Sequence, residues 1–158
     1  MTTRRVLKPA SPARPKSQPA VTTGRTGSTK PGPGAVINYV YLFATEQAAG
    51  RDEGVKERPV VVIAADDRGY IVVPVTTKGE IDPANSIPLP AEVGQAMGLP
   101  RASESAIVVS EANSFDWMGH DVRDLPSGGH LYGIVPPGFF AKIVREALAR
   151  RTKPIDRR

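Results

Sequence analysis

Residues 50–79 constrain the fold of this chain more than any other stretch, because they predict two strands joined by a tight turn. Residues 60–64 and 70–75 are apolar or β-branched runs of strand length, and residues 66–69 between them have the composition of a turn. In the resulting hairpin, Arg58 enters the first strand and Thr76 leaves the second. The two residues are therefore expected at the same end of the hairpin, within reach of one ligand.

The composition fits one domain with a modest core. Of the 158 residues, 40% are hydrophobic and 6% aromatic. No stretch approaches the run of about 20 apolar residues that a membrane span needs. The absence of cysteine excludes disulfides and thiolate metal sites, and His120 and His130 alone offer little to a metal ion. We therefore expect a soluble, cytoplasmic protein with no metal ion, no cofactor and no membrane partner.

The positive charge of the chain is concentrated near its two ends. Residues 1–35 hold seven basic residues and no acidic one, whereas residues 150–158 hold five basic residues and one acidic residue. Residues 36–149 hold nine basic and fifteen acidic residues, so this central part is mildly acidic although the whole chain has a net charge of +5. Nucleic-acid binding would therefore depend on a local basic cluster, to which the tails add salt-sensitive affinity.

The composition also changes along the chain. Residues 1–35 are rich in Pro, Gly, Ser, Thr and basic residues and show no apolar periodicity, which predicts a disordered tail. Arginine and serine are also typical of transit peptides, but the prolines oppose the amphipathic helix that such a peptide needs. The folded domain is expected at residues 36–151, with a basic C-terminal tail at residues 152–158.

Further strands and two helices are predicted within the domain. Residues 36–43 are aromatic and β-branched and predict a first strand, and shorter strands are expected at residues 86–89 and 105–110. Residues 90–98 begin with proline and end with glycine, as a short helix does. Residues 137–151 repeat apolar side chains at spacings of three and four, which predicts an amphipathic C-terminal helix.

The remaining segments are predicted to be loops. Residues 44–57 form a charged connection, longer than most and of the kind that often binds ligands. Residues 117–129 are mostly loop, with a short strand near residues 121–125. Since the apolar face of the C-terminal helix must be covered, we expect it to pack on the strands. The predicted fold class is mainly β with α: a small, mostly antiparallel β-barrel with a short helix after the barrel strands and a C-terminal α-helix.

Several motifs occur in a particular order. Glu53 lies five residues before the pair Arg58-Pro59, and the second strand of the hairpin ends in Pro74-Val75-Thr76. These motifs are followed by a Gly-Leu pair at residues 98–99, a Ser at residue 105 before an apolar strand, and the C-terminal helix. In this order and spacing the chain resembles, over about residues 36–150, the MazF/PemK-like toxin family. The family often has an arginine after its third core strand, where this chain has residues 111–117.

The resemblance implies an SH3-like barrel of the CcdB/MazF type, usually a homodimer. It also implies the toxin, or growth inhibitor, of a type II toxin-antitoxin system, a hydrolase-type endoribonuclease that cuts single-stranded RNA or mRNA without a metal and is neutralised by a cognate antitoxin. Residue by residue, Arg58 matches the catalytic arginine of the family and Thr76 its catalytic threonine. Glu53 matches the acidic residue of the same loop.

Metal-independent RNA cleavage uses the ribose 2′-hydroxyl as nucleophile against the neighbouring phosphate. Arg58 can hold two phosphate oxygens, and Thr76 can donate a hydrogen bond to the same phosphate. Glu53 or Glu111 can accept the 2′ proton, and their spacing does not decide between them. RNA contacts are predicted for residues near this end of the hairpin and after the 105–110 strand, with Trp117 stacking on a base: Arg51, Lys56, Thr77, Lys78, Glu111, Asn113 and Trp117.

Each of these residues also has an ordinary structural explanation. An arginine that precedes a strand often forms a surface ion pair, here with Glu53 or Glu57, and threonine is common in strands. The alternative function is therefore a catalytically inactive module of the same fold that binds RNA or a protein partner. Growth arrest on induced expression would distinguish the toxin from the inactive module.

Overall fold

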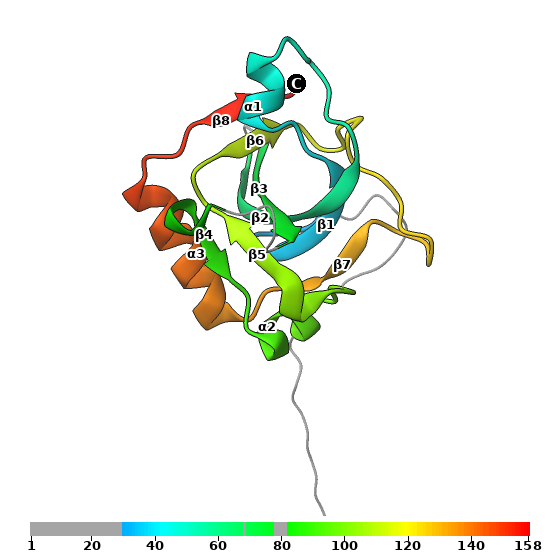
Figure 1. The fold of residues 1–158 in the computed structure, drawn as a ribbon. Helices are drawn as coiled ribbons and strands as arrows, with labels where there is room; N and C mark the ends of the chain where they lie inside the picture. The colour runs from blue at the N-terminus through cyan, green and yellow to red at the C-terminus, as the bar shows by residue number, and fades with distance from the viewer. Residues whose placement is uncertain (1–29, 68, 78–81) are drawn as a thin grey trace, which may run out of the picture. The chain divides into compact units, whose positions relative to one another are not determined.

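The computed structural model describes residues 30–67, 69–77 and 82–158. Residues 1–29 of the predicted tail and Lys78 lie outside this part of the chain. The elements, shown in Figure 1, are β1 (Ala35–Val40), α1 (Ala44–Ala48), β2 (Glu57–Asp66), β3 (Gly69–Thr77), η4 (Pro83–Asn85), β4 (Ser86–Pro88), α2 (Ala91–Ala96), η5 (Ala102–Glu104), β5 (Ser105–Val108), β6 (Ala112–Phe115), β7 (Leu131–Ile134), α3 (Pro137–Ala149) and β8 (Pro154–Asp156).

The eight strands form one mostly antiparallel sheet. Its main path runs β4-β5-β3-β2-β1-β7, and β6 pairs with β3 and with β8. Only the β6–β8 pair is parallel among these described strands. The predicted mainly-β, antiparallel fold with a C-terminal helix is confirmed. The sheet curves round, as Figure 1 shows, but it is not a closed barrel, because its end strands β4 and β7 do not pair with each other.

The β2–β3 hairpin forms as the sequence predicts, with longer strands. Its register runs from Asp66 opposite Gly69 to Val60 opposite Pro74. Gly69 has a φ of 124°, and a Cβ there would lie 2.7 Å from the carbonyl oxygen of Phe115, so the turn needs glycine. If the register is continued past Val60, Arg58 lies opposite Thr76. The hairpin therefore brings these two residues together at its open end.

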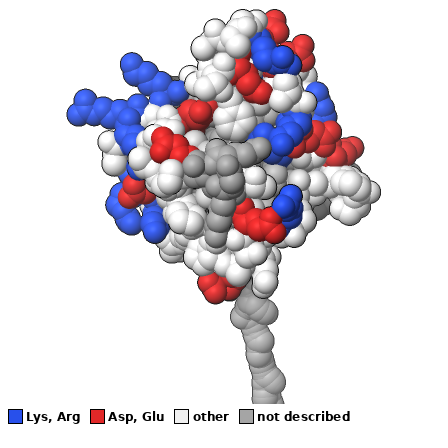
Figure 2. Space-filling model, in the orientation of Figure 1, with Lys and Arg blue, Asp and Glu red and all other residues white. Residues whose placement is uncertain are grey.

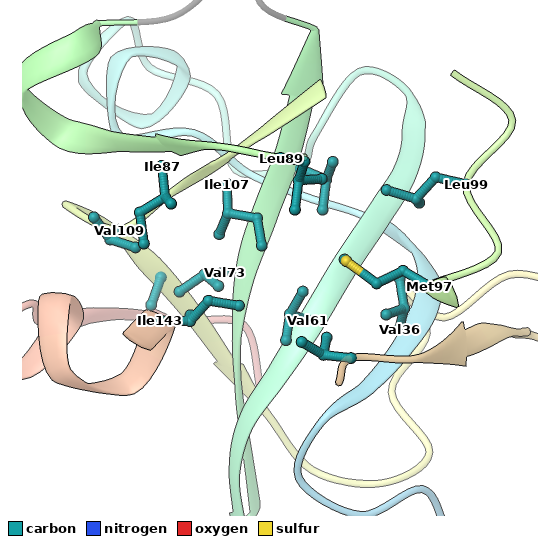
Figure 3. Packing of buried hydrophobic residues seen from close by; sticks show 13 residues of the cluster. Val36, Val61, Val73, Ile87, Leu89, Met97, Leu99, Ile107, Val109 and Ile143 are labelled. Atoms are coloured by element: carbon teal, nitrogen blue, oxygen red, sulfur yellow. The ribbon is translucent and has the colours of Figure 1, made fainter. Parts of the chain in front are cut away.

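Both faces of the hairpin are buried, because successive strand residues point to opposite sides. Val61 and Val73 belong to a core that includes Ile143 of α3, and we call this the α3-side core (Figure 3). Val60 and Val72 belong to a second core, which we call the tyrosine-side core. It consists of Ala35, Ile37, Tyr39, Tyr41, Val60, Val62, Tyr70, Val72, Phe115 and Val122.

The two predicted helices are present. The short helix α2 follows Pro90, and the 13-residue α3 begins at Pro137. The apolar stripe of α3 packs Phe139, Phe140 and Ile143 on the α3-side core. Burial of a side chain such as Ile143 contributes about 1.5–3 kcal/mol. Within the described residues, no helix is long and apolar enough to cross a membrane.

Several segments differ from the sequence-based expectation. The predicted 44–57 loop contains α1, the predicted strand near residues 121–125 is only an isolated bridge between Val122 and Tyr39, and β6 and β7 were not predicted. The residues predicted as a basic C-terminal tail form β8, which pairs with β6. Arg157 also forms a buried ion pair with Asp121. This pair fixes the C-terminal residues to the domain.

Candidate functional site

Arg58 and Thr76 lie next to each other at the open end of the β2–β3 hairpin. Strand alternation puts both on the side of the tyrosine-side core, since Arg58 is in phase with Val60 and Thr76 is in phase with Val72. Arg58 is half-buried, whereas Thr76 is only 7% exposed. The sequence placed these two residues at one end of a hairpin, and the structure puts them on the same face as well.

The hydroxyl of Thr76 is buried and has no hydrogen-bond partner among the described residues. A buried polar group without a partner costs about 1–3 kcal/mol, so such groups are rare in folded proteins and call for an explanation. Thr76 is the second-last residue of β3 and pairs with Ala106 of β5 at the open end of the hairpin. The residue lines the pocket described below, although its hydroxyl is itself buried.

The guanidinium of Arg58 lies over the aromatic ring of Phe43, with its Cζ atom 4.7 Å from the ring centroid. This cation–π contact contributes about 0.5–2 kcal/mol and orients the planar guanidinium. Phe43 is itself oriented by an edge contact with Tyr41, whose ring centroid is 4.8 Å away. Arg58 is thus held by aromatic packing at the start of its strand.

The segment that carries Phe43 is fixed by two side chains near the start of β6. Glu111 Oε1 accepts hydrogen bonds from the backbone N–H of Ala44, at 2.9 Å, and from the hydroxyl of Tyr41, at 3.3 Å. The Asn113 amide accepts from the N–H of Leu42 and donates to its carbonyl, both at 2.9 Å. The amide of Asn113 is therefore fully buried and holds the backbone of Leu42, and its RNA contact stays a prediction.

The carboxyl of Glu111 is chemically distinctive. Burial raises its pKa above the ordinary value of 4.5, while the hydrogen bonds from Ala44 and Tyr41 act in the opposite direction. Burial, followed by the negative charge of Glu111, also raises the pKa of Tyr41, and the positive charge of Arg58 opposes that rise. A carboxylate with a raised pKa is a stronger proton acceptor near neutral pH.

Glu53 is placed differently from Glu111. It is exposed in the loop between α1 and β2, whereas Glu111 is half-buried, and neither of them lines the pocket described next. The loop turns back at Gly54, where a Cβ would lie 2.3 Å from the carbonyl oxygen of Tyr41. The role of Glu53 therefore stays a prediction.

A pocket of about 190 Å³ opens at the hairpin end. It is lined by the start of β2, the end of β3, the connection from α2 to η5, and the start of β5: Lys56, Glu57, Arg58, Pro59, Val75, Thr76, Thr77, Leu99, Pro100, Arg101 and Ser105. The predicted residues Lys56, Arg58, Thr76 and Thr77 are thus brought together. Sequence reasoning missed Arg101, because only the tertiary fold places the 99–101 segment beside the hairpin.

The charges of this pocket suit an anion. Lys56, Arg58 and Arg101 line it, against the single carboxylate of Glu57, which accepts a hydrogen bond from Asn38 Nδ2 at 2.8 Å. On the face seen in Figure 2, acidic and basic side chains are interspersed, so a local cluster of this kind matters more than the net charge. Within the described ranges, no group of three or more His, Asp or Glu side chains could hold a metal ion.

Two other predicted RNA-binding residues lie apart from the pocket. Arg51 is exposed after α1, and its backbone N–H bonds to the carbonyl of Glu46. Trp117 packs on Tyr70 and His130, with ring centroids 5.5 and 5.0 Å away. Tyr70 stands at the turn end of β3, about 20 Å along the strand from Thr76 at about 3.3 Å per residue. A joint role of Trp117 with the pocket is therefore not supported.

Comparison with protein-family models and with curated proteins finds no match. Among solved structures, the chain is similar to the crystal structure of MazE-MazF (Form-II) from Deinococcus radiodurans. The similarity covers 76% of this chain and 90% of that chain, with 16% sequence identity and a TM-score of 0.44. The function of this protein is therefore argued from its own residues.

Proposed function

We propose that this protein is an endoribonuclease that cleaves single-stranded RNA without a metal ion. The observation that carries the proposal is the buried hydroxyl of Thr76, which has no partner within the described residues, beside an arginine held on an aromatic ring. A phosphate bound at the hairpin end would accept a hydrogen bond from Thr76 and receive the charge of Arg58. Both residues line a pocket whose charged side chains are mostly basic.

Arg58 and Thr76 would stabilise the phosphorane-like transition state. The 2′-oxygen forms a bond to phosphorus while the bond from phosphorus to the 5′-oxygen breaks. The departing 5′-oxygen takes a proton from solvent water, which leaves a 2′,3′-cyclic phosphate and a free 5′-hydroxyl. Negative charge builds up on the non-bridging oxygens during this step. A guanidinium can hold two of those oxygens, and loss of one such preorganised donor typically costs a factor of about 10²–10³ in rate.

A carboxylate must accept the proton of the 2′-hydroxyl. Of the two glutamates considered from the sequence, Glu111 is the better candidate, because it is half-buried, bonds to Tyr41, which packs on the Phe43 ring under Arg58, and has a raised pKa. Glu53 is exposed and is hydrogen-bonded to neither Tyr41 nor Ala44, and neither glutamate lines the pocket. General bases of this kind contribute about 10²–10⁴-fold to rate.

The proposed biological role is that of the toxin in a type II toxin-antitoxin pair. This role is supported by the order and spacing of Glu53, Arg58-Pro59 and Thr76, which resemble the MazF/PemK-like family. It includes a homodimer, a cognate antitoxin and a cytoplasmic location. Induced expression should arrest growth for the active chain but not for Arg58→Ala, and growth arrest by the variant would contradict the role.

The enzymatic proposal is tested by incubating the purified protein with mixed single-stranded RNA in the presence of a chelator. We expect fragments with 2′,3′-cyclic phosphate ends. Arg58→Ala should abolish cleavage, whereas Arg145→Ala, which removes an exposed arginine on α3, should cleave like the wild type. Equal cleavage by the Arg58 and Arg145 variants would overturn the proposed site, and an RNA-binding wild type that never cleaves would favour the inactive module.

A further inference from the structure

We infer that Arg101 binds a second phosphate of the RNA, adjacent to the phosphate held by Arg58 and Thr76. This inference rests on the proposed function and extends its substrate contacts. Arg101 lies in the connection between α2 and η5, and no motif in the sequence pointed to it. It lines the same pocket as Arg58 and Thr76.

The pocket joins the two faces of the hairpin end. Arg58 and Thr76 lie on the side of the tyrosine-side core, whereas Thr77 is the next residue along β3 and points to the opposite face. Thr77 pairs with Ser105, whose hydroxyl donates to the carbonyl of Arg101 at 2.7 Å. The backbone of Arg101 therefore lies on the same side of the strand end as Thr77, opposite to the side chain of Arg58. An RNA strand crossing this end would present successive phosphates to the two arginines.

The backbone around Arg101 is firmly held. Its neighbours Leu99 and Ala102 are buried, at 7% and 8% exposure. Gly98 has a φ of 77°, and a Cβ there would lie 2.2 Å from the carbonyl oxygen of Tyr132 in β7. The connection is thus packed against the sheet, while the side chain of Arg101 is 64% exposed. A fixed backbone with an accessible guanidinium limits the entropy lost when a phosphate binds.

The present partner of Arg101 is easily displaced. Its guanidinium pairs with Glu104, whose side chain is 58% exposed. An exposed ion pair of this kind contributes only about 0–1 kcal/mol, so a phosphate can replace the carboxylate. Because Glu104 competes with the phosphate, its removal should strengthen RNA binding, whereas removal of Arg101 should weaken it. General loss of folding would not give these opposite effects.

The test uses the full chain and a single-stranded RNA whose 2′-hydroxyls are all methylated, so that it binds but is not cut. Fluorescence anisotropy gives its dissociation constant over a range of salt concentrations. For Arg101→Ala we expect the slope of log affinity against log salt to fall by about 0.7, the value for one phosphate contact in a single strand, which is about fourfold weaker binding at about 0.15 M salt. Arg101→Lys should recover part of the affinity, and Glu104→Gln should bind more tightly than the wild type.

The controls separate this inference from the proposed function. Arg145→Ala should leave both affinity and slope unchanged. With cleavable RNA, Arg101→Ala should raise KM by about the same fourfold factor, because it weakens RNA binding, whereas Arg58→Ala should lower kcat. An Arg101 variant that binds like Arg145→Ala, or that loses kcat as Arg58→Ala does, would overturn the inference alone. A wild type that neither binds nor cuts RNA would overturn the proposed function and the inference together.

Discussion

The guanidinium of Arg58 lies 4.7 Å above the ring of Phe43, although the two residues come from different elements. Phe43 immediately precedes α1, and Arg58 is the second residue of β2. The contact links the proposed phosphate-binding arginine to the segment that Glu111 and Asn113 fix through Ala44, Tyr41 and Leu42. The geometry of Arg58 therefore depends on side chains that do not line the pocket.

Phe43→Leu should lower the rate of RNA cleavage about fivefold, because an apolar side chain is kept but the cation–π contact, worth about 1 kcal/mol, is lost. Phe43→Tyr keeps the aromatic face and should cleave like the wild type. Single-turnover kinetics at saturating RNA measure this rate. If the leucine and tyrosine variants cleave equally fast, aromatic orientation of Arg58 is not part of the mechanism.

Thr76→Val should raise stability and remove activity. The substitution replaces a buried hydroxyl that lacks a partner within the described residues by a methyl group of similar size, which should increase the free energy of unfolding by about 1 kcal/mol. Cleavage should fall by a factor of about 10²–10³, because a hydrogen bond to the phosphate is lost. Urea unfolding and a cleavage assay measure the two effects.

Thr76→Ser is the matched control for this substitution, since it keeps the hydroxyl and should retain most of the cleavage rate. A valine variant that is less stable than the wild type would show that the hydroxyl already has a partner in the folded protein. A valine variant that cleaves normally would remove Thr76 from the proposed mechanism.

Glu111→Gln should flatten the pH dependence of both stability and cleavage. Because burial raises the pKa of Glu111 above 4.5, its stabilising contribution is fully present below pH 4.5 and is lost as the pH rises through the folded-state pKa. Glutamine keeps the oxygen that accepts from Ala44 and Tyr41 but never ionises, so at pH 7 the variant should be at least as stable as the wild type.

The same variant should lose the acidic limb of the kcat profile and about 10²–10⁴-fold in rate, if Glu111 accepts the 2′ proton. Unfolding curves and cleavage rates between pH 4 and pH 8 measure both effects, with Glu53→Gln as the matched comparison. An unchanged profile for Glu111→Gln together with a lost acidic limb for Glu53→Gln would assign the proton transfer to the exposed glutamate instead.

Asn113→Ala should destabilise the fold by about 2–3 kcal/mol, because two buried hydrogen bonds to the backbone of Leu42 disappear and leave its N–H and carbonyl without those partners. Binding of RNA by the folded fraction should not change. Thermal unfolding measures the stability, and fluorescence anisotropy measures the RNA affinity. Weaker RNA binding at unchanged stability would support the RNA contact of Asn113 that the sequence predicts.

Arg157→Ala should lower the free energy of unfolding by about 3–5 kcal/mol, because it leaves the buried carboxylate of Asp121 without its ion pair to Arg157. The side chains of Arg157 and Asp121 are 8% and 3% exposed, and Arg157 Nε lies 3.1 Å from Asp121 Oδ2. The double variant Arg157→Ala, Asp121→Asn should recover part of the loss. Wild-type stability in the single variant would mean that the C-terminal residues behave as the tail that the sequence suggested.

Local patterns were sufficient to predict the hairpin, α2 and α3. Strand-length apolar runs around residues 66–69 predict the hairpin, and the apolar repeat of residues 137–151 predicts α3, because neighbouring residues alone determine both signals. The end of the hairpin that carries Arg58 and Thr76 followed from the same pattern. The proximity of Arg58 and Thr76 could therefore be predicted without a tertiary structure.

Tertiary contacts explain what the sequence did not predict. Strand β6 contains Asn113 and Ser114, which have low strand propensity, and it forms because it pairs with β3 and β8. No local sequence pattern indicates the roles of Asn113 and Arg101. Asn113 bonds to the distant Leu42, and Arg101 reaches the pocket only through the packing of residues 97–102. Long-range partners of this kind leave no periodicity in the chain.

The most direct measurement of the central claim is the single-turnover rate at which the purified protein cuts single-stranded RNA in a chelator, compared between wild type, Arg58→Ala and Arg145→Ala. The proposed mechanism predicts cleavage to 2′,3′-cyclic phosphate ends by the wild type and the Arg145 variant, and a rate at least about 10²-fold lower for Arg58→Ala. Cleavage by folded Arg58→Ala at the wild-type rate would contradict it.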